Sequence, residues 1–143
     1  MINYQLFAEL KAAIEEKYSS THEMYCEEPH KTYRNHRIWD NYGIRIVSTN
    51  FTIAVLCEYD QNDPDADVYV GVKVLYINNE ASQLSQYLNS QNKDGQSRGI
   101  DKNFHRRWFS WPYWKTIKSV NDGLILFDKL LSDCNDFLSK KIF

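Results

Sequence analysis

The sequence predicts one α+β (α/β) domain in which helices pack on a mixed or antiparallel sheet of about four strands. The chain has 143 residues, enough for one domain that buries roughly two-thirds of its unfolded surface. Apolar residues recur at helical spacing near both ends, and three consecutive runs between them have strand patterns. No linker, internal repeat or low-complexity segment divides the chain, so we predict a single domain over 1–143.

An amphipathic helix is predicted in the first 18 residues. Charged side chains such as Glu9, Lys11 and Glu15 lie on one side of it, and apolar side chains recur three and four residues apart on the other. The apolar stripe consists of Leu6, Phe7, Leu10, Ala13, Ile14 and Tyr18. This pattern disappears over 19–37, a polar and partly acidic connection for which we predict no regular element.

Three strands are predicted next, as a meander. Residues 38–48 and 51–59 alternate between apolar and polar side chains, and residues 48–50 between them predict a hairpin. The run 67–77 is apolar on both faces and rich in β-branched residues, which is typical of a central strand covered on both sides. We therefore expect helices to pack on this sheet.

A second helix is predicted after Asn79. Its buried stripe would consist of Ala81, Leu84, Tyr87 and Leu88. Residues 91–99 are polar and contain two glycines, so we expect the helix to end there in a mobile loop.

An edge strand and a last helix complete the prediction. The chain should be extended up to Pro112, because Pro112 disfavours helical geometry at Trp111 and cannot donate a hydrogen bond in a central ladder. Asn121 or Asp122 can cap the last helix, which should pack on the sheet. Its apolar face consists of Leu124, Phe127, Leu130, Leu131, Cys134, Phe137, Leu138 and Ile142.

Residues 102–118, the aromatic-basic segment, hold six aromatic rings and five Lys or Arg side chains without a carboxylate. In a structural interpretation, the tryptophans fill the space between sheet and last helix while cationic side chains lie over their rings. The residues concerned are Arg106, Arg107, Trp108, Trp111, Trp114 and Lys115. Large rings belong to cores more often than to ligand sites, so this interpretation is favoured.

The same segment has two binding interpretations. For nucleic acid, its cations would contact phosphates and an exposed tryptophan would stack on a base. The net charge of −2 and the pI near 6.1 restrict such binding to a local patch. For a protein partner, one or two exposed rings would be the main contacts within a charged rim.

An acidic loop consists of Glu58, Asp60, Asp63, Asp65 and Asp67. Pro64 occupies the place of the third ligand of a calcium loop, and the turn glycine and distal Glu of that loop are missing. A solvated hairpin loop is the favoured interpretation. In the alternative, the clustered carboxylates imitate phosphates and attract a basic partner.

The element order, and the motif RRWFSWPYW followed by LILFDKLLSDCNDFL, resemble the αβββαβ core of the PD-(D/E)XK nuclease superfamily. They also resemble accessory domains of unknown function attached to some of those nucleases. The resemblance covers most of the chain. It implies a magnesium site with an acid two residues before a lysine on the third strand, where this chain has Gly71-Val72-Lys73. Pro64-Asp65 supplies the letters PD, but the resemblance implies a degenerate metal site.

Other chemistries are weakly indicated. His22, Cys26 and His30 have the spacing of zinc ligands, but Pro29 interrupts the helix that would align them, so no metal is predicted. The three cysteines, at 26, 57 and 134, lack the signature of a nucleophile or a disulfide scaffold and fit a reducing compartment. Neither a secretory segment nor a membrane span is expected, so we predict a cytoplasmic location.

We therefore expect macromolecular binding without catalytic residues or cofactors. The favoured function is a small inhibitor in a bacterial or phage conflict system, for toxin immunity or anti-defence, that binds a protein such as a basic nuclease or nucleoprotein. The alternative is a nucleic-acid-binding, nuclease-like domain with a degenerate metal site. The sequence predicts neither the partner's identity nor the oligomeric state.

Overall fold

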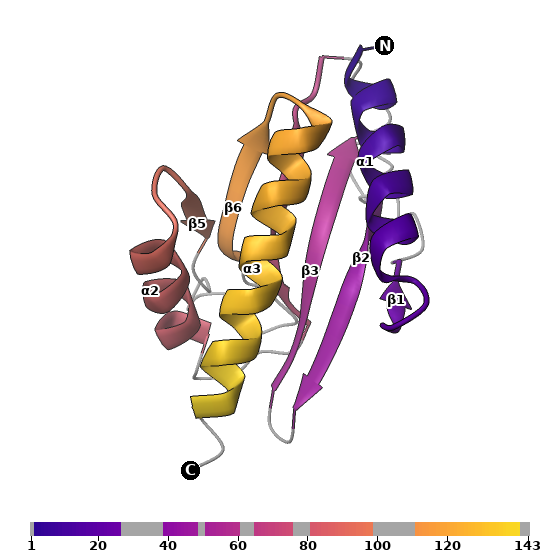
Figure 1. The fold of residues 1–143 in the computed structure, drawn as a ribbon. Coiled ribbons are helices and arrows are strands. Elements are labelled where there is room, and N and C mark those ends of the chain that lie inside the picture. The colour runs from indigo at the N-terminus through magenta and orange to yellow at the C-terminus, as the bar shows by residue number, and fades with distance from the viewer. Residues whose placement is uncertain are drawn as a thin grey trace.

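Six strands and three helices make up the part of the chain that the structure describes (Figure 1). A computed structural model describes residues 2–26, 39–48, 51–60, 65–75, 81–98 and 111–140. The helices are α1 (Ile2–Tyr18), α2 (Ala81–Gln91) and α3 (Val120–Lys140). The strands are β1 (Met24–Tyr25), β2 (Trp39–Ser48), β3 (Phe51–Asp60), β4 (Val68–Val74), β5 (Gln96–Arg98) and β6 (Trp111–Ile117). The predicted α+β class and the order of the main elements are confirmed.

The strands form one antiparallel sheet in the order β1-β2-β3-β4-β6-β5. The sheet has two more strands than expected, because the short β1 and β5 extend its two sides. β5 lies in the predicted mobile loop and pairs with β6, so β6 is not the outermost strand. Pro112 is compatible with this inner position because the β5–β6 ladder is irregular there and the pairs with β4 begin only at Tyr113.

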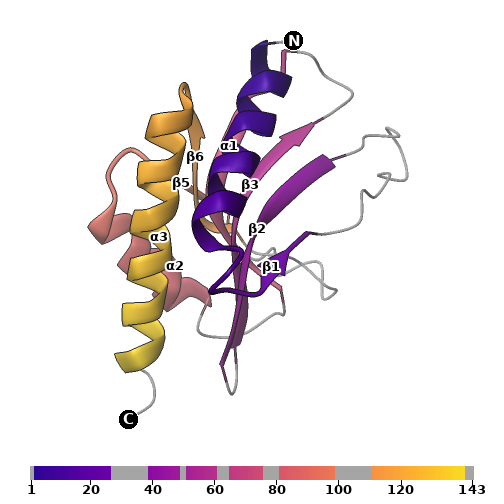
Figure 2. The ribbon, with the colours of Figure 1, turned by 45° about the vertical axis from the view of Figure 1, so that its right-hand side comes forward.

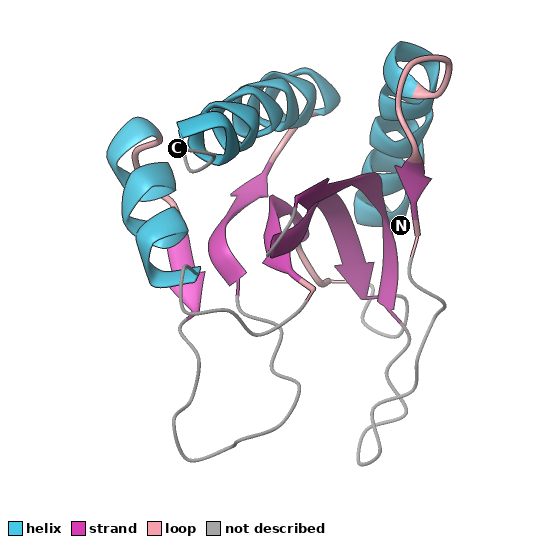
Figure 3. Cartoon of the chain, turned by 90° about the horizontal axis from the view of Figure 1, so that it is seen from below, coloured by secondary structure: helices cyan, strands magenta, loops and turns pink. Residues whose placement is uncertain are grey.

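The helices lie on one face of the sheet, with α1 and α3 side by side (Figures 2 and 3). α2 lies on the same side, beside β6 and α3. The apolar stripes predicted for α1 and α3 face the sheet, where Leu10, Ile14, Phe127 and Leu130 are fully buried. The other fully buried side chains of this core include Ile53, Val55, Cys57, Val70, Val72, Leu84, Leu88, Tyr113 and Cys134.

The cap of α3 differs from the prediction. Ser119, rather than Asn121 or Asp122, stands before the first helical residue, and its Oγ accepts a hydrogen bond from the Asp122 amide at 3.1 Å. A serine side chain bonded to the amide three residues later is the usual N-cap geometry. Asp122 then lies in the first turn, where its negative charge interacts favourably with the positive end of the helix dipole.

Polar contacts at two places attach α3 to the other helices in the described part of the chain. At the end of α1, the Tyr18 hydroxyl donates to the Asp128 carboxylate, and Lys17 Nζ lies 2.6 Å from the same carboxylate. At the end of α2, Asn92 Nδ2 donates to Asp133 Oδ2 at 2.8 Å. These contacts join α3 to the ends of α1 and α2, in addition to the apolar packing between the helices.

Asp133 is the more buried of the two carboxylates. It is only 5% exposed, and Lys129 Nζ also donates to its two oxygens, at 2.8 and 2.9 Å. Removal of a buried carboxylate that accepts several hydrogen bonds destabilises a fold, because its hydrogen-bond donors lose their acceptor.

We predict that Asp133→Ala lowers the free energy of unfolding by about 1–3 kcal/mol, because Asn92 and Lys129 both lose their shared acceptor. Urea unfolding followed by circular dichroism measures this. The matched control is Asp136→Ala, on the exposed side of the same helix, which should change stability by less than about 0.5 kcal/mol. Equal effects of the two substitutions would contradict a stabilising role for the Asp133 hydrogen bonds.

Candidate functional site

The strand register sorts the side chains of the sheet into two faces. Directly paired residues of antiparallel strands point to the same side, and neighbours along a strand alternate. Val55, Cys57 and Val70 belong to the helix-covered core, so the residues between them point away from the helices. We call this opposite side the second face (Figure 3). Its residues are Asn41, Gly43, Arg45, Val47, Thr52, Ala54, Leu56, Glu58, Tyr69, Gly71, Lys73, Trp114 and Thr116.

A β-bulge in β6 adds Trp111 to the second face. Gln96 pairs with Trp114 and Arg98 pairs with Trp111, so a step of two residues in β5 spans three residues in β6. In a regular strand, residues 111 and 114 would point to opposite faces, and the extra residue reverses this. The result is visible in the contact between Lys73 and Trp111, in which Nζ lies 5.6 Å from the ring centroid.

The second tryptophan is held by its neighbour on β4. The Trp114 and Tyr69 rings make an edge contact, with centroids 5.1 Å apart and planes at 79°. Trp111, Trp114 and Tyr69 all remain partly exposed. Three aromatic rings therefore reach solvent on the β4–β6 half of the second face.

The middle of the second face is closely packed. Leu56 is fully buried between Gly43 and Gly71, which are its partners on the two neighbouring strands. A Cβ atom at Gly71 would lie 2.5 Å from the Tyr113 carbonyl oxygen and 2.8 Å from Trp114 Cβ. Because the obstacle is backbone, no side chain fits at residue 71 without moving β6. The close approach of β4 and β6 therefore requires a glycine at residue 71, the position where the nuclease resemblance implies an acid.

Lys73 is the lysine that the nuclease resemblance singles out. Its side chain is 5% exposed, on the second face beside Ala54 and beneath Trp111. Tyr69, Gly71 and Lys73 alternate with valines in the sequence, so they could have been recognised as one face of a strand. No pattern in the sequence indicates the β-bulge that places Trp111 on the same face as these residues.

The predicted aromatic-basic surface is divided by the sheet. Lys115 pairs with Val70 and so points to the helix side, opposite to Trp114. Arg106, Arg107 and Trp108 lie outside the described residues. Of the described members of this predicted set, Trp111 and Trp114 are brought together on the second face.

The predicted acidic loop is also divided. Glu58 is partly buried on the second face, whereas Asp65 and Asp67 are exposed ahead of β4. Asp63 and the side chain of Asp60 lie outside what the structure describes. Asp67 Oδ1 lies 3.8 Å from Lys118 Nζ.

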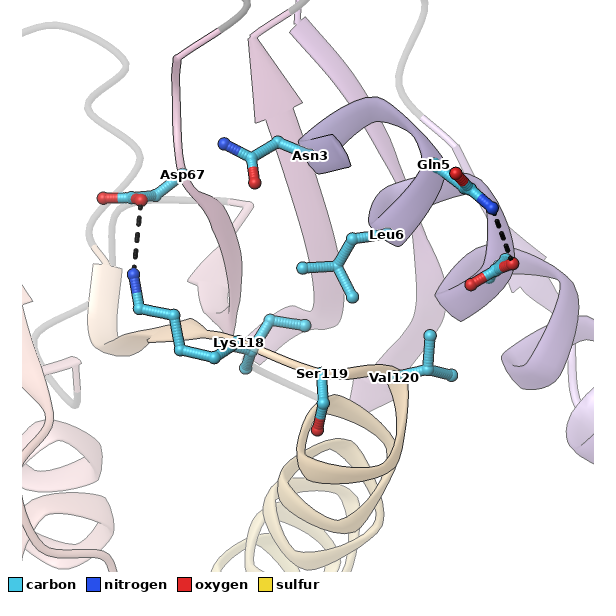
Figure 4. Close-up of a pocket in the computed structure, with 9 residues that line it drawn as sticks. Asn3, Gln5, Leu6, Asp67, Lys118, Ser119 and Val120 are labelled. Carbon is cyan, nitrogen blue, oxygen red and sulfur yellow. Dashed lines mark hydrogen bonds and ion pairs between the residues drawn. The ribbon is translucent and has the colours of Figure 1, made fainter. Parts of the chain in front are cut away.

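A cavity of about 410 Å³ lies near Asp67, at the beginnings of α1 and α3 (Figure 4). The side chains of Leu6, Ile117 and Val120 provide its apolar walls. Its polar lining consists of Asn3, Gln5, Glu9, Asp67, Lys118 and Ser119. This volume lies within the range of roughly 300–1,000 Å³ that is typical of ligand sites.

The cysteines differ in accessibility. Cys57 and Cys134 are fully buried, and burial raises the pKa of Cys57 to about 12 and the pKa of Cys134 still further. Cys26 is exposed, as is His22, while the third predicted zinc ligand, His30, lies outside the described residues. Within the described ranges, no three His, Cys, Asp or Glu side chains form a group that could hold a metal ion.

No protein-family model, curated protein or solved structure matches this chain. The resemblance to PD-(D/E)XK nucleases therefore stays a prediction. None of the described helices is both long and apolar enough to cross a membrane.

We predict that Gly71→Ala lowers the free energy of unfolding by about 1–3 kcal/mol, since its methyl group would collide with the β6 backbone. The control is Gly123→Ala in α3, where a Cβ would meet only the side-chain ends of Ile117 and Leu10 and helix propensity favours alanine. Chemical unfolding of both variants compares the two sites. If the Gly71→Ala protein is as stable as the Gly123→Ala protein, the close approach of the β4 and β6 backbones at residue 71 is disproved.

We predict that a thiol reagent at pH 8 labels Cys26 rapidly and the two buried cysteines only on unfolding. Because Cys57 and Cys134 stay protonated in the folded state, unfolding releases protons once the pH exceeds the ordinary thiol pKa of about 8.5. Stability should therefore fall as pH rises above that value. Mass spectrometry locates the label, and Cys26→Ser should remove the fast phase. Rapid native labelling of Cys57 would contradict its burial.

Proposed function

We propose that this domain is a protein-binding module without a catalytic role, and that it binds its partner through the β4–β6 half of the second face. The observation that carries the proposal is the bulge that places Trp111 and Trp114 on one face, beside Tyr69. Tryptophan and tyrosine are the residue types most enriched among the main contacts of protein interfaces.

The fixed arrangement of these rings supports the proposal. Trp114 rests against Tyr69, and Trp111 lies over the Lys73 ammonium group, so each ring is held before a partner arrives. Binding then loses little side-chain entropy, which is a large part of the cost of association.

Two observations weigh against chemistry at the positions that the sequence singled out. Residue 71 has no room for the carboxylate that a nuclease-like metal site would need. The raised pKa of Cys57 and of Cys134 keeps both thiols protonated near neutral pH, where a nucleophile must be a thiolate.

Among the described residues, the charges on the second face favour a protein over a nucleic acid. Phosphate binding needs cations that reach solvent, but Lys73 is buried and Lys115 points to the helix side. Arg45 is exposed on the second face, but its guanidinium lies 3.3 Å from the Glu23 carboxylate. A nucleic-acid-binding role is the second candidate because a partly exposed tryptophan ring can also stack on a base.

We further propose that the role is inhibitory, as in toxin immunity or anti-defence, with a basic nuclease or nucleoprotein as the partner. The support is the small size of the chain, its net charge of −2 and its high aromatic content of 15%. A negatively charged chain attracts a basic partner and is repelled by free nucleic acid.

We predict that the tagged protein captures a protein from lysate of its source cells, with or without added nuclease. Trp114→Ala should weaken this capture by about 2 kcal/mol, or roughly 30-fold in affinity. Thr116→Lys, which adds a positive charge on the second face without removing an aromatic ring, should weaken it as well, because the charge repels a basic partner. The control is Tyr4→Ala, which removes a 51% exposed ring from α1.

The outcomes separate the two candidate functions. Circular dichroism first confirms that each variant is folded. Capture that disappears after nuclease treatment would favour nucleic-acid binding, and capture insensitive to both Trp114→Ala and Thr116→Lys would refute the second face as the interface.

A further inference from the structure

The outer edge of β2, on the side away from β3, is only partly covered by β1. β2 pairs with β3 along its whole length, but β1 pairs with β2 only at Gly43 and Ile44. Figures 1 and 2 show the end of β2 extending past β1 and α1. No described strand pairs with this edge over 45–48.

The hydrogen bonds of the sheet show which main-chain groups of β2 face β3. The Leu75 amide donates to the Thr52 carbonyl oxygen at 2.9 Å, so the main-chain groups of Thr52 face β4. These groups alternate in direction along an antiparallel strand, so those of Ile53 face β2. Ile53 pairs with Ile46, and the main-chain groups of Ile46 therefore face β3.

Arg45 and Val47, the neighbours of Ile46, consequently direct their N–H and C=O groups to the outer edge. Gly43 points the same way by this alternation and pairs there with Tyr25 of β1. Among the described residues, the main chains of Arg45 and Val47 have no hydrogen-bond partner on this edge. Such unpaired groups on a strand edge are a template for another extended chain.

The side chains leave this part of the edge accessible. Val47 is 62% exposed, and the Arg45 guanidinium is held 3.3 Å from the carboxylate of Glu23, just before β1. Proteins commonly protect an open edge with a lysine, a proline or a β-bulge. Residues 46–48 are Ile-Val-Ser, and the pairing of β2 with β3 is regular throughout, so this edge has none of these protections.

A second copy of the chain fits this edge poorly. Two copies of β2 would pair antiparallel about a two-fold axis, with hydrogen-bonded pairs between Arg45 and Val47. In that register, Ser48 of the other copy would lie opposite Ile44. Met24 of β1 already occupies that place. A short segment of another protein meets no such obstacle, because it can end where β1 begins.

We propose that the outer edge of β2 over 45–48 binds an extended segment of a protein partner, which adds a strand to the sheet in line with β1. The main chain of the segment bonds to the outward groups of Arg45 and Val47. A β-branched side chain of the segment lies beside Val47 on the second face. The inference rests on the proposed function only in that the partner is a protein, and it does not depend on the tryptophans of β6.

A titration of the ¹⁵N-labelled protein with the peptide acetyl-Lys-Thr-Val-Thr-Val-Lys-amide tests the proposal. We expect saturable shifts of the backbone amides over 45–48, with a Kd on the order of millimolar. The same peptide, N-methylated at its threonine and valine amides, cannot donate main-chain hydrogen bonds from these residues. It should bind about tenfold more weakly or worse.

Amide hydrogen exchange gives a second measurement that needs no variant. In the free protein, the Val47 amide should exchange faster than the Ile46 amide, because only the Ile46 amide is bonded to β3. Saturation with the peptide should slow exchange at Arg45 and Val47 by about tenfold and leave Ile46 unchanged.

Matched variants at one residue separate the main chain from the side chain. Val47→Pro removes an outward N–H without removing a bond to β3, a position at which an edge strand tolerates proline, and should weaken peptide binding about tenfold. Val47→Thr keeps the main-chain groups and the β-branched shape, so it should bind the peptide within about twofold of wild type. Circular dichroism checks that both variants are folded.

The proposal is overturned if the N-methylated peptide binds as well as its parent, if folded Val47→Pro binds like wild type, or if the largest shifts fall on β5 or β6. Equal exchange of the Val47 and Ile46 amides in the free protein would also overturn it. Concentration-dependent shifts over 45–48 without peptide would do so as well, because they would indicate a second copy on this edge.

The titration is independent of the second face. Trp114→Ala should bind the peptide like wild type, because β6 lies on the other side of β3 and β4 from this edge. Failure of the edge would thus show in the titration, whereas failure of the proposed function would show in the capture experiment.

Discussion

The close approach of β4 to β6 is the constraint on which the rest of this structure depends. At Gly71 the two backbones leave no room for a Cβ atom. The same approach aligns Trp114 with Gly71 across the strands and lets its ring reach Tyr69, two residues earlier on β4. A larger residue at 71 would separate the strands and move the aromatic rings together with the β6 backbone. One glycine thus allows the close packing of β4 and β6 and determines the position of the proposed contact surface.

The sequence predicts the helix-covered half of this fold well, because its signals are local. Leu10 and Ile14 recur at helical spacing and are fully buried, and the alternating residues of β3 face the core as expected. Amphipathic periodicity requires no knowledge of the partner element. The same holds for the order of the elements, which follows from the succession of these patterns.

The remaining features could not be predicted because other segments determine them. β5 contains only Gln96, Ser97 and Arg98, which have no apolar alternation, and its pairing depends on β6. The irregular pairing around Pro112 brings Trp111 and Trp114 to one face, although simple alternation places them on opposite faces. The cavity joins Asn3 to Asp67 and Lys118, residues far apart in the chain that meet only when α1, β4 and α3 assemble.

β4 connects the cavity to the second face. Asp67 lines the cavity immediately before the strand begins, and Tyr69, Gly71 and Lys73 form the β4 side of the second face. Because desolvated aromatic contacts mainly slow dissociation, the tryptophans of the second face would act on the residence time of a protein partner rather than on the rate of its association.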